Sequence, residues 1–166
     1  MAENKVNQVL LNPKRLVGAD LGAWLEAGGG RGLQAALDHP AAIVATLEAA
    51  GLGGMGGAGF PTWRKWEATV NAKSKNGGKY VVCNANEDEP GTFKDRFLLE
   101  HTPHQVIEGT LIAAVACRAN HVVMYINPHQ KESIAAVGAA IEQWRQHELF
   151  KQIETYLGEP LSLKLV

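Results

Sequence analysis

The chain has 166 residues, a formal net charge of −1 from 16 basic and 17 acidic side chains, and two cysteines. This length suits one ordinary domain that can bury a real core. The near-neutral charge excludes the long-range field that gathers nucleic acid or anionic membranes, so no nucleic-acid partner is expected. Two cysteines are too few for a disulfide framework, and Cys83 and Cys117 are interpreted as buried thiols.

Neither a membrane span nor a targeting segment is predicted. No apolar run approaches the roughly 20 residues that a membrane-spanning helix needs. The first residues, MAENKVNQVLLNPKR, lack the basic region and apolar core of a signal peptide. We therefore expect a cytoplasmic protein without direct membrane insertion, or one held peripherally on a membrane complex.

The first third of the chain predicts helices separated by glycine. Residues 1–39 are interpreted as a helical lead-in, with a short helix around residues 19–28 and a glycine break at residues 28–30. From Pro40 the run AAIVATLEAAG predicts a helix, because Pro40 suits a first turn and Gly51 suits a helix end. Residues 40–166 are then expected to form one domain.

Two short β-branched runs predict buried strands, KYVVCNAN at residues 79–86 and HVVMYINP at residues 121–128. Thr102, Pro103 and Gln105 predict a capped helix between them, and residues 127–130 open a second helix in the same way, with Trp144 on its apolar face. LSLKLV at the C-terminus could supply another strand. Strand, helix, strand, helix implies parallel pairing, so the predicted fold class is α/β.

The densest glycine segment is Gly51–Gly59, with six glycines in nine residues. A helix precedes it, no acid occurs over residues 68–85, and Phe60 stands where a phosphate loop has lysine, so standard nucleotide loops do not fit. Dense glycine still lets backbone N–H groups line a concavity for a flat or phosphorylated ligand. The next residues predict a helix whose positive end faces the loop, with Arg64 and Lys65 adding charge. A flexible or tightly packed surface loop is the alternative.

An acidic segment, NANEDEPGT at residues 84–92, follows the first predicted strand. Ligands in open α/β sheets bind at this carboxyl edge, and Pro90 with Gly91 suits a type II turn. Amides and carboxylates can pair with a polyol, a ribose or a carboxamide. A solvated acidic turn or an adventitious metal site is the alternative here. His101 and His104 lie near acids, but helix capping explains His104, so no metal site is predicted.

Three segments together resemble one family. The chain reads GMGGAGFPTWRKW at residues 54–66, NANEDEPGTFKDR at residues 84–96 and PHQVIEG at residues 103–109. Over about residues 40–166 it resembles the FMN-binding subunit of NADH dehydrogenase (complex I) and its relatives in NAD-reducing hydrogenases and NAD-dependent formate dehydrogenases. The resemblance implies a Rossmann-like FMN-binding domain, in which a parallel sheet is flanked by helices.

The resemblance also implies a reaction and its residues. The reaction is hydride transfer from NADH to FMN, followed by single-electron transfer to iron–sulfur clusters on partner polypeptides. Phe60 would stack on the adenine of NADH, and Glu89, the implied catalytic residue, would lie near the nicotinamide. The residues implied to bind FMN come from the glycine loop, the helix after it and the acidic segment: Gly54, Gly56, Gly57, Ala58, Gly59, Lys65, Asn84, Asn86, Glu87 and Asp88.

Departures from the family pattern leave other functions open. Met55, Asn86 and Ala68 stand where the family commonly has arginine, aspartate and often an aromatic residue. The family continues beyond a strand like LSLKLV into a second glycine loop and a domain with cluster cysteines. An iron–sulfur cluster is thus expected only on a missing segment or a partner, and the expected partners are iron–sulfur subunits and a second flavoprotein half. The alternatives are a flavin- or nucleotide-binding module or split subunit without turnover alone, and a subunit of the membrane-bound ferredoxin:NAD reductase complex.

Overall fold

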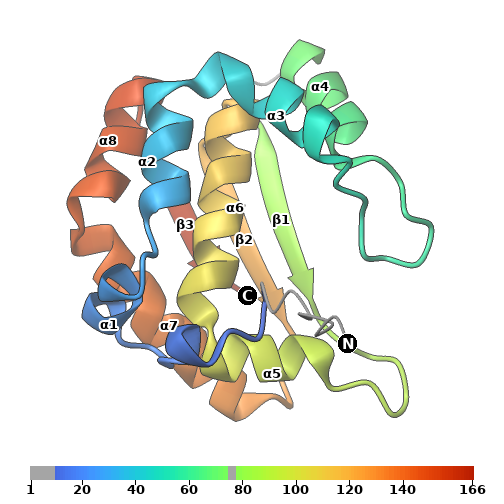
Figure 1. Cartoon of the computed structure of the whole chain (residues 1–166), viewed down its shortest axis with the longest axis vertical. Coiled ribbons are helices and arrows are strands. Elements are labelled where there is room, and N and C mark those ends of the chain that lie inside the picture. The colour runs from blue at the N-terminus through green and yellow to red at the C-terminus, as the bar shows by residue number, and fades with distance from the viewer. Residues whose placement is uncertain (1–9, 75–77) are drawn as a thin grey trace, which may run out of the picture.

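The computed structural model describes residues 10–74 and 78–166 and contains a parallel sheet with helices packed against it (Figure 1). The strands are β1 (Tyr80–Ala85), β2 (His121–Ile126) and β3 (Ser162–Leu165), and they lie side by side in the order β1-β2-β3. All three fall in the predicted runs, and both pairings are parallel. The predicted α/β class is therefore confirmed.

Helices precede and connect the strands. Those in the predicted segments are α1 (Leu21–Glu26), α3 (Ile43–Ala50), α4 (Thr62–Asn71), α6 (Pro103–Cys117) and α7 (Lys131–Gln146). No individual range was predicted for three more, the first of which lies in the predicted helical lead-in: α2 (Arg31–Asp38), α5 (Lys94–His101) and α8 (Glu148–Leu157). Short 3-10 turns occur at Pro13–Arg15 and Pro40–Ala42, and the second leads into α3. No helix within residues 10–74 and 78–166 is long and apolar enough to cross a membrane. The first nine residues, where no signal peptide is expected, lie outside the described part.

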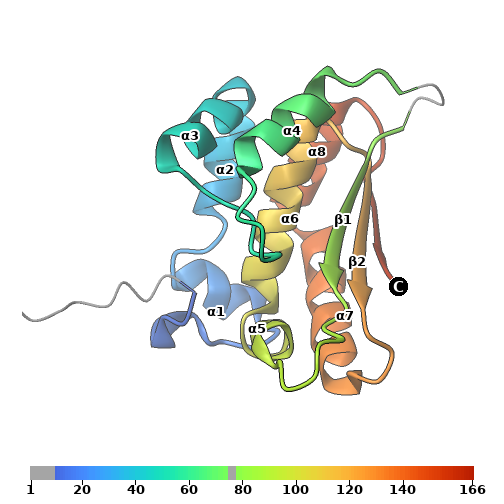
Figure 2. The same ribbon diagram turned by 90° about the vertical axis from the view of Figure 1, so that its right-hand side faces the viewer.

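The core lies between the sheet and α6, with α7 and α8 beside them (Figure 2). Val122, Met124 and Leu163 point into it from the strands, and Trp144 of α7 is fully buried as predicted. Leu33 of α2 is also fully buried, because α2 packs against α6. The lead-in therefore contributes to the same core as the strands, and its boundary at residue 39 stays a prediction.

The helix α6 begins at Pro103 as predicted, but its predicted side-chain cap is absent, and the predicted start of α7 is displaced. The Thr102 hydroxyl donates to the carbonyl oxygen of Leu98 (3.1 Å) at the end of α5, so it does not cap α6. The second predicted start lies in a turn, in which the Asn127 side-chain oxygen accepts from the backbone N–H of His129 (2.9 Å), and α7 begins only at Lys131. In both cases the short polar side chain bonds to a nearby backbone group and not to the N–H groups of the helix that it was predicted to cap.

The two cysteines and His104 are wholly or partly shielded from solvent. Cys117 is buried as predicted, whereas Cys83 is half-buried, and burial raises the pKa of both thiols. His104 is fully buried beside Trp144, with ring centroids 6.3 Å apart, and burial lowers its pKa. Across the described residues, no group of three or more His, Cys, Asp or Glu side chains is placed to hold a metal ion.

Candidate functional site

The glycine loop between α3 and α4 is closed at its base by backbone pairing. Gly54 N–H donates to the carbonyl oxygen of Phe60 (2.8 Å), and Thr62 N–H donates to that of Leu52 (2.9 Å). A Cβ built on Gly53 would lie 3.2 Å from the Gly59 carbonyl oxygen, so a side chain there would press the two sides of the base apart. Glycine at the base thus allows the chain to close the loop on itself.

The tip of the loop has a different reason for its glycines. Gly57 and Gly59 have positive φ angles of +91° and +59°, a conformation that glycine adopts readily. Gly56 has no such angle, and a Cβ built on it would meet no atom within 4 Å. Neither backbone conformation nor packing against the described chain therefore requires glycine at Gly56. It leaves an open stretch of backbone that a ligand can approach closely.

A small pocket lies between the loop and the start of α4. It has a volume of about 410 Å³, and Lys65 and the half-exposed Phe60 lie in its wall. The other cation, Arg64, lies over the ring of Trp63 at 5.1 Å instead. The first turn of α4 has no side-chain cap, and Pro61 occupies the N-cap, one residue before the predicted first-turn position. This glycine-loop pocket is lined by Gly54, Gly56, Ala58, Gly59, Phe60, Thr62, Lys65 and Trp66.

A second pocket, of about 690 Å³, lies between the loop tip and the acidic segment after β1. Gly56 lines both pockets, so the two adjoin. Together they contain every residue that the family resemblance assigns to FMN or NADH. This acidic pocket is lined by Met55, Gly56, Gly57, Asn84, Asn86, Glu87, Asp88, Glu89, Thr92, Lys94 and Asp95.

The acidic segment folds back through the predicted type II turn. Gly91 has a φ of +79°, and Thr92 N–H donates to the Glu89 carbonyl oxygen (3.1 Å). The turn leaves Glu89 exposed at the pocket wall. Within the described residues, no hydrogen bond or ion pair engages its carboxylate. The carboxylate of Glu89 is therefore available to a ligand.

Two neighbouring carboxylates instead shape the pocket. Glu87, in the left-handed region with φ of 47°, accepts from the backbone N–H groups of Asp95 (2.7 Å) and Arg96 (3.1 Å), and so caps α5. Asp88 accepts from the side-chain amides of Asn86 and of Asn127, the latter at 3.0 Å. Asn127 follows β2, so Asp88 ties the ends of two adjacent strands together. No local sequence pattern indicates this role for Asn127.

Lys94 is a pocket residue that sequence reasoning missed. Its ammonium group pairs with Asp95 at 2.8 Å. The hydrogen bond from Lys94 to Asp95 raises the pKa of the lysine, and the charges of Asp95, Glu87 and Glu89 add to the effect. The lysine supplies a positive charge beside four acids. Its place in the FKDR part of the matched segment could have drawn attention to it.

A family comparison now decides which ligand to consider. The sequence profile of the Nuo51 FMN-binding domain matches residues 47–160, which contain the glycine loop, the acidic segment and most of the sheet. The chain belongs to this FMN-binding family. The expected resemblance is thereby confirmed.

Longer proteins are similar to the chain throughout this region. An NADH-quinone oxidoreductase subunit of Aquifex aeolicus (strain VF5) is 38% identical over 143 residues, which are 86% of this chain and 33% of that protein. An NADH-quinone oxidoreductase subunit of Rhizobium meliloti (strain 1021) is 45% identical over 121 residues, 71% of this chain and 28% of that protein. The crystal structure of air-oxidized NAD⁺-reducing [NiFe]-hydrogenase superposes with a TM-score of 0.67 at 31% identity, over 88% of this chain and 24% of the hydrogenase chain. The chain thus spans a third or less of these relatives' length.

Proposed function

We propose that the chain is the FMN-binding portion of an NADH-oxidising electron-transfer subunit. The observation that carries the proposal is the open backbone at Gly56, which separates a pocket containing Lys65 from one lined by amides and carboxylates. A flavin mononucleotide has these same two ends, an anionic phosphate and a polar ring joined by a polyol. The family and its NADH- and NAD⁺-linked relatives point to the same ligand.

The pockets fit the cofactor in size and in charge. Their volumes of about 690 and 410 Å³ fall within the range of roughly 300 to 1,000 Å³ usual for ligand sites. Lys65 and the uncapped first turn of α4 suit the phosphate. Four acids would repel a phosphate from the acidic pocket, whose amides suit the polyol and the ring. We therefore propose one orientation, with the phosphate toward Lys65 and the polyol and ring toward the acidic pocket.

Bound FMN would supply the redox chemistry, taking a hydride from NADH and releasing electrons singly to iron–sulfur clusters on partner subunits. The chain would orient the reactants. Phe60, 55% exposed at the pocket wall, offers a face on which the adenine of NADH can stack. Glu89 offers a carboxylate beside the nicotinamide, where positive charge develops as hydride leaves.

Two alternative functions for the chain lead to different expectations. A flavin- or nucleotide-holding module, or a split subunit that needs its other half, would bind FMN without turnover in isolation. A subunit of a ferredoxin:NAD reductase complex would share the glycine loop. The family profile favours the NADH dehydrogenase family over the ferredoxin:NAD reductase complex, because its match extends well beyond the glycine loop to residue 160.

We propose a cytoplasmic or peripheral location, with iron–sulfur subunits and a second flavoprotein half as partners.

The proposal is tested by Glu89→Gln in the native assembly. Losing the negative charge should slow reduction of bound flavin by NADH by about tenfold to a thousandfold, while flavin occupancy is retained. Stopped-flow absorbance of the flavin measures the rate. Glu159→Gln, an exposed acid outside both pockets, is the matched control and should reduce at the wild-type rate. Wild-type kinetics in a fully flavinylated Glu89→Gln assembly would remove this carboxylate from the reaction.

A further inference from the structure

Within residues 10–74 and 78–166, no helix covers one face of the sheet. Figure 2 shows the strands along one side of the molecule, with the helices on the other. The uncovered face includes Tyr80, Val82 and Tyr125, which are 64%, 58% and 42% exposed. The strand registers place its side chains in three rows, which are Tyr80, His121 and Ser162; Val82, Val123 and Lys164; and Asn84, Tyr125 and Val166. We call these nine residues the outer face.

The topology explains why this chain leaves the outer face bare. The strands follow one another in the order β1-β2-β3, and both connections are parallel crossovers. Right-handed crossovers that advance in one direction place all their helices on the same face of a sheet. Parallel sheets in α/β proteins are nevertheless covered on both faces. The described helices thus complete one layer and leave the opposite layer to other polypeptide.

The chemistry of the outer face suits apolar helices. Apolar and aromatic side chains occupy its centre, and none of its nine residues is acidic. Its one lysine, Lys164, lies at the β3 edge, and His121 is stacked on Tyr80 with ring centroids 4.5 Å apart. An exposed apolar patch of this kind marks a contact surface more often than a solvated one. A helix with an apolar stripe and an acid opposite Lys164 would complement it.

We infer that the outer face docks amphipathic helices from the second half of the flavoprotein, on whichever polypeptide that half is carried. The matched region is 33% of the Aquifex relative and 24% of the hydrogenase chain, so such relatives have ample further sequence to form a second layer. The outer face is continuous with the candidate site, because Asn84 ends one of its rows and also lines the acidic pocket. The docked half would therefore reach the ligand. This inference rests on the proposed function for the existence of a second half.

Site-specific photo-crosslinking in the native assembly tests the inference. The photoreactive residue p-benzoylphenylalanine replaces Tyr80 or Tyr125 in the tagged chain within its own organism, and the exposed Lys151 of α8 is the control position. Both outer-face positions should cross-link to a helix of a polypeptide that matches the unmatched part of the Aquifex relative, and position 151 should not. Cross-links between two copies of this chain, to an iron–sulfur subunit alone, or to nothing would overturn the inference.

A charge-insertion pair provides an independent measurement. Val82→Lys places a cation in the middle of the outer face, and Leu11→Lys, at a position that is 51% exposed and outside the strands, is the matched control. Both purified chains should keep the wild-type melting temperature. Only Val82→Lys should release the second half from the affinity-purified assembly, by at least tenfold in recovered mass. Equal recovery would overturn the inference. Because neither readout involves flavin or turnover, the inference and the proposed function can fail separately.

Discussion

Two glycine-rich segments of this chain are similar in sequence and opposite in environment. A Cβ built on Gly29 would lie 2.1 Å from the indole nitrogen of Trp24, and one built on Gly30 would lie 2.8 Å from Leu25. A Cβ built on Gly56 would meet no atom within 4 Å. Glycine is required in the first segment by the chain's own packing. In the second segment no described atom crowds Gly56, and the proposed FMN would supply the reason for glycine there.

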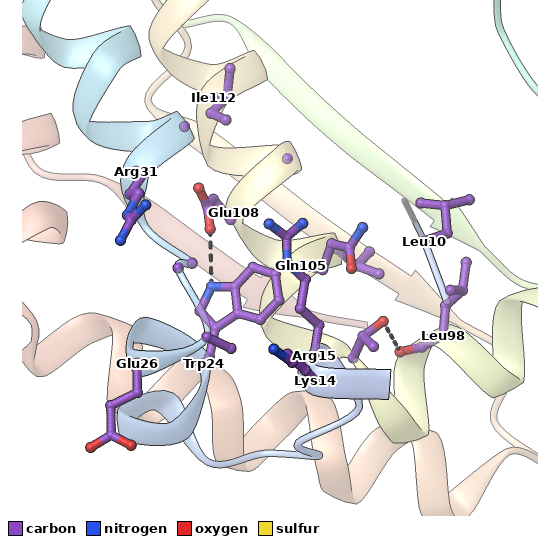
Figure 3. Close-up of a pocket in the computed structure, with 17 residues that line it drawn as sticks. Leu10, Lys14, Arg15, Trp24, Glu26, Arg31, Leu98, Gln105, Glu108 and Ile112 are labelled. Carbon is purple, nitrogen blue, oxygen red and sulfur yellow. Dashed lines mark hydrogen bonds between the residues drawn. The ribbon is translucent and has the colours of Figure 1, made fainter. Parts of the chain in front are cut away.

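The first segment belongs to a buried structural network. Glu108 of α6, only 7% exposed, accepts from Trp24 Nε1 at 3.0 Å, as Figure 3 shows. It also accepts from Gly30 N–H (2.7 Å) and Leu33 N–H (3.1 Å). It thus fixes the Trp24 ring and caps the start of α2. A pocket of about 830 Å³ lies beside this network, between α1, α2 and α6. Both oxygens of Glu108 are bonded by the chain itself, unlike those of Glu89.

The largest effect is expected from alanine at the crowded glycine. Gly29→Ala forces the buried Trp24 ring or the backbone to move, and should lower the free energy of unfolding by about 3 kcal/mol. Gly56→Ala, the matched control, should change it by less than about 0.5 kcal/mol. Urea unfolding followed by far-ultraviolet circular dichroism measures both. Equal destabilisation by the two alanines would erase the distinction between the segments.

The two capping glutamates sharpen the same comparison. Glu108→Gln weakens charge-assisted bonds inside the core and should destabilise the protein by about 2 to 3 kcal/mol. Glu87→Gln changes a partly exposed cap of α5 and should have an effect of about 1 kcal/mol. Urea unfolding again provides the numbers, and the Trp24 indole N–H resonance should shift only in Glu108→Gln. A larger loss of unfolding free energy in Glu87→Gln than in Glu108→Gln would contradict the greater structural role assigned to Glu108.

The smallest effect is expected from His104 as pH falls. Burial lowers the pKa of this histidine, so the folded protein favours its neutral form. Its contribution to stability is present above the unfolded pKa of about 6.5 and is lost as pH falls below that value toward the folded pKa. His104→Leu should flatten the decline in unfolding free energy between about pH 7 and pH 5, whereas exposed His101→Gln should not. An unchanged slope in His104→Leu would contradict the assignment.

The sequence predicted those features whose signals are local. The strand runs, the type II turn at Gly91 and the long α6 were all predicted, since alternation, turn residues and helical periodicity act over a few positions. Two of the three helices that it did not predict, α2 and α5, are capped by side chains outside them, whereas α8 has its own cap in His147. α2 has no capping side chain of its own and is capped by Glu108, 78 residues after Gly30, while α5 is capped by Glu87.

The residues of the candidate site likewise fall into those that local motifs predict and those that depend on tertiary contacts. The family resemblance named its glycines, Lys65 and the acidic segment, all of which lie in contiguous motifs. Asn127 was missed because its bond to Asp88 joins residues 39 positions apart. Lys94 was missed because its contribution depends on the acids that the turn gathers around it. Tertiary contacts of this kind leave no local pattern to read.

The central claim is that the open backbone at Gly56 exists for FMN. The most direct test titrates the purified chain with FMN and follows quenching of flavin fluorescence, for the wild type and for Gly56→Val. Gly56 is a better position for this substitution than Gly57, because a side chain at Gly57, with its φ of +91°, would strain the backbone. We predict saturable binding by the wild type and at least tenfold weaker binding by Gly56→Val, with similar unfolding free energies. Equal affinities, or no saturable binding by either chain, would contradict the account.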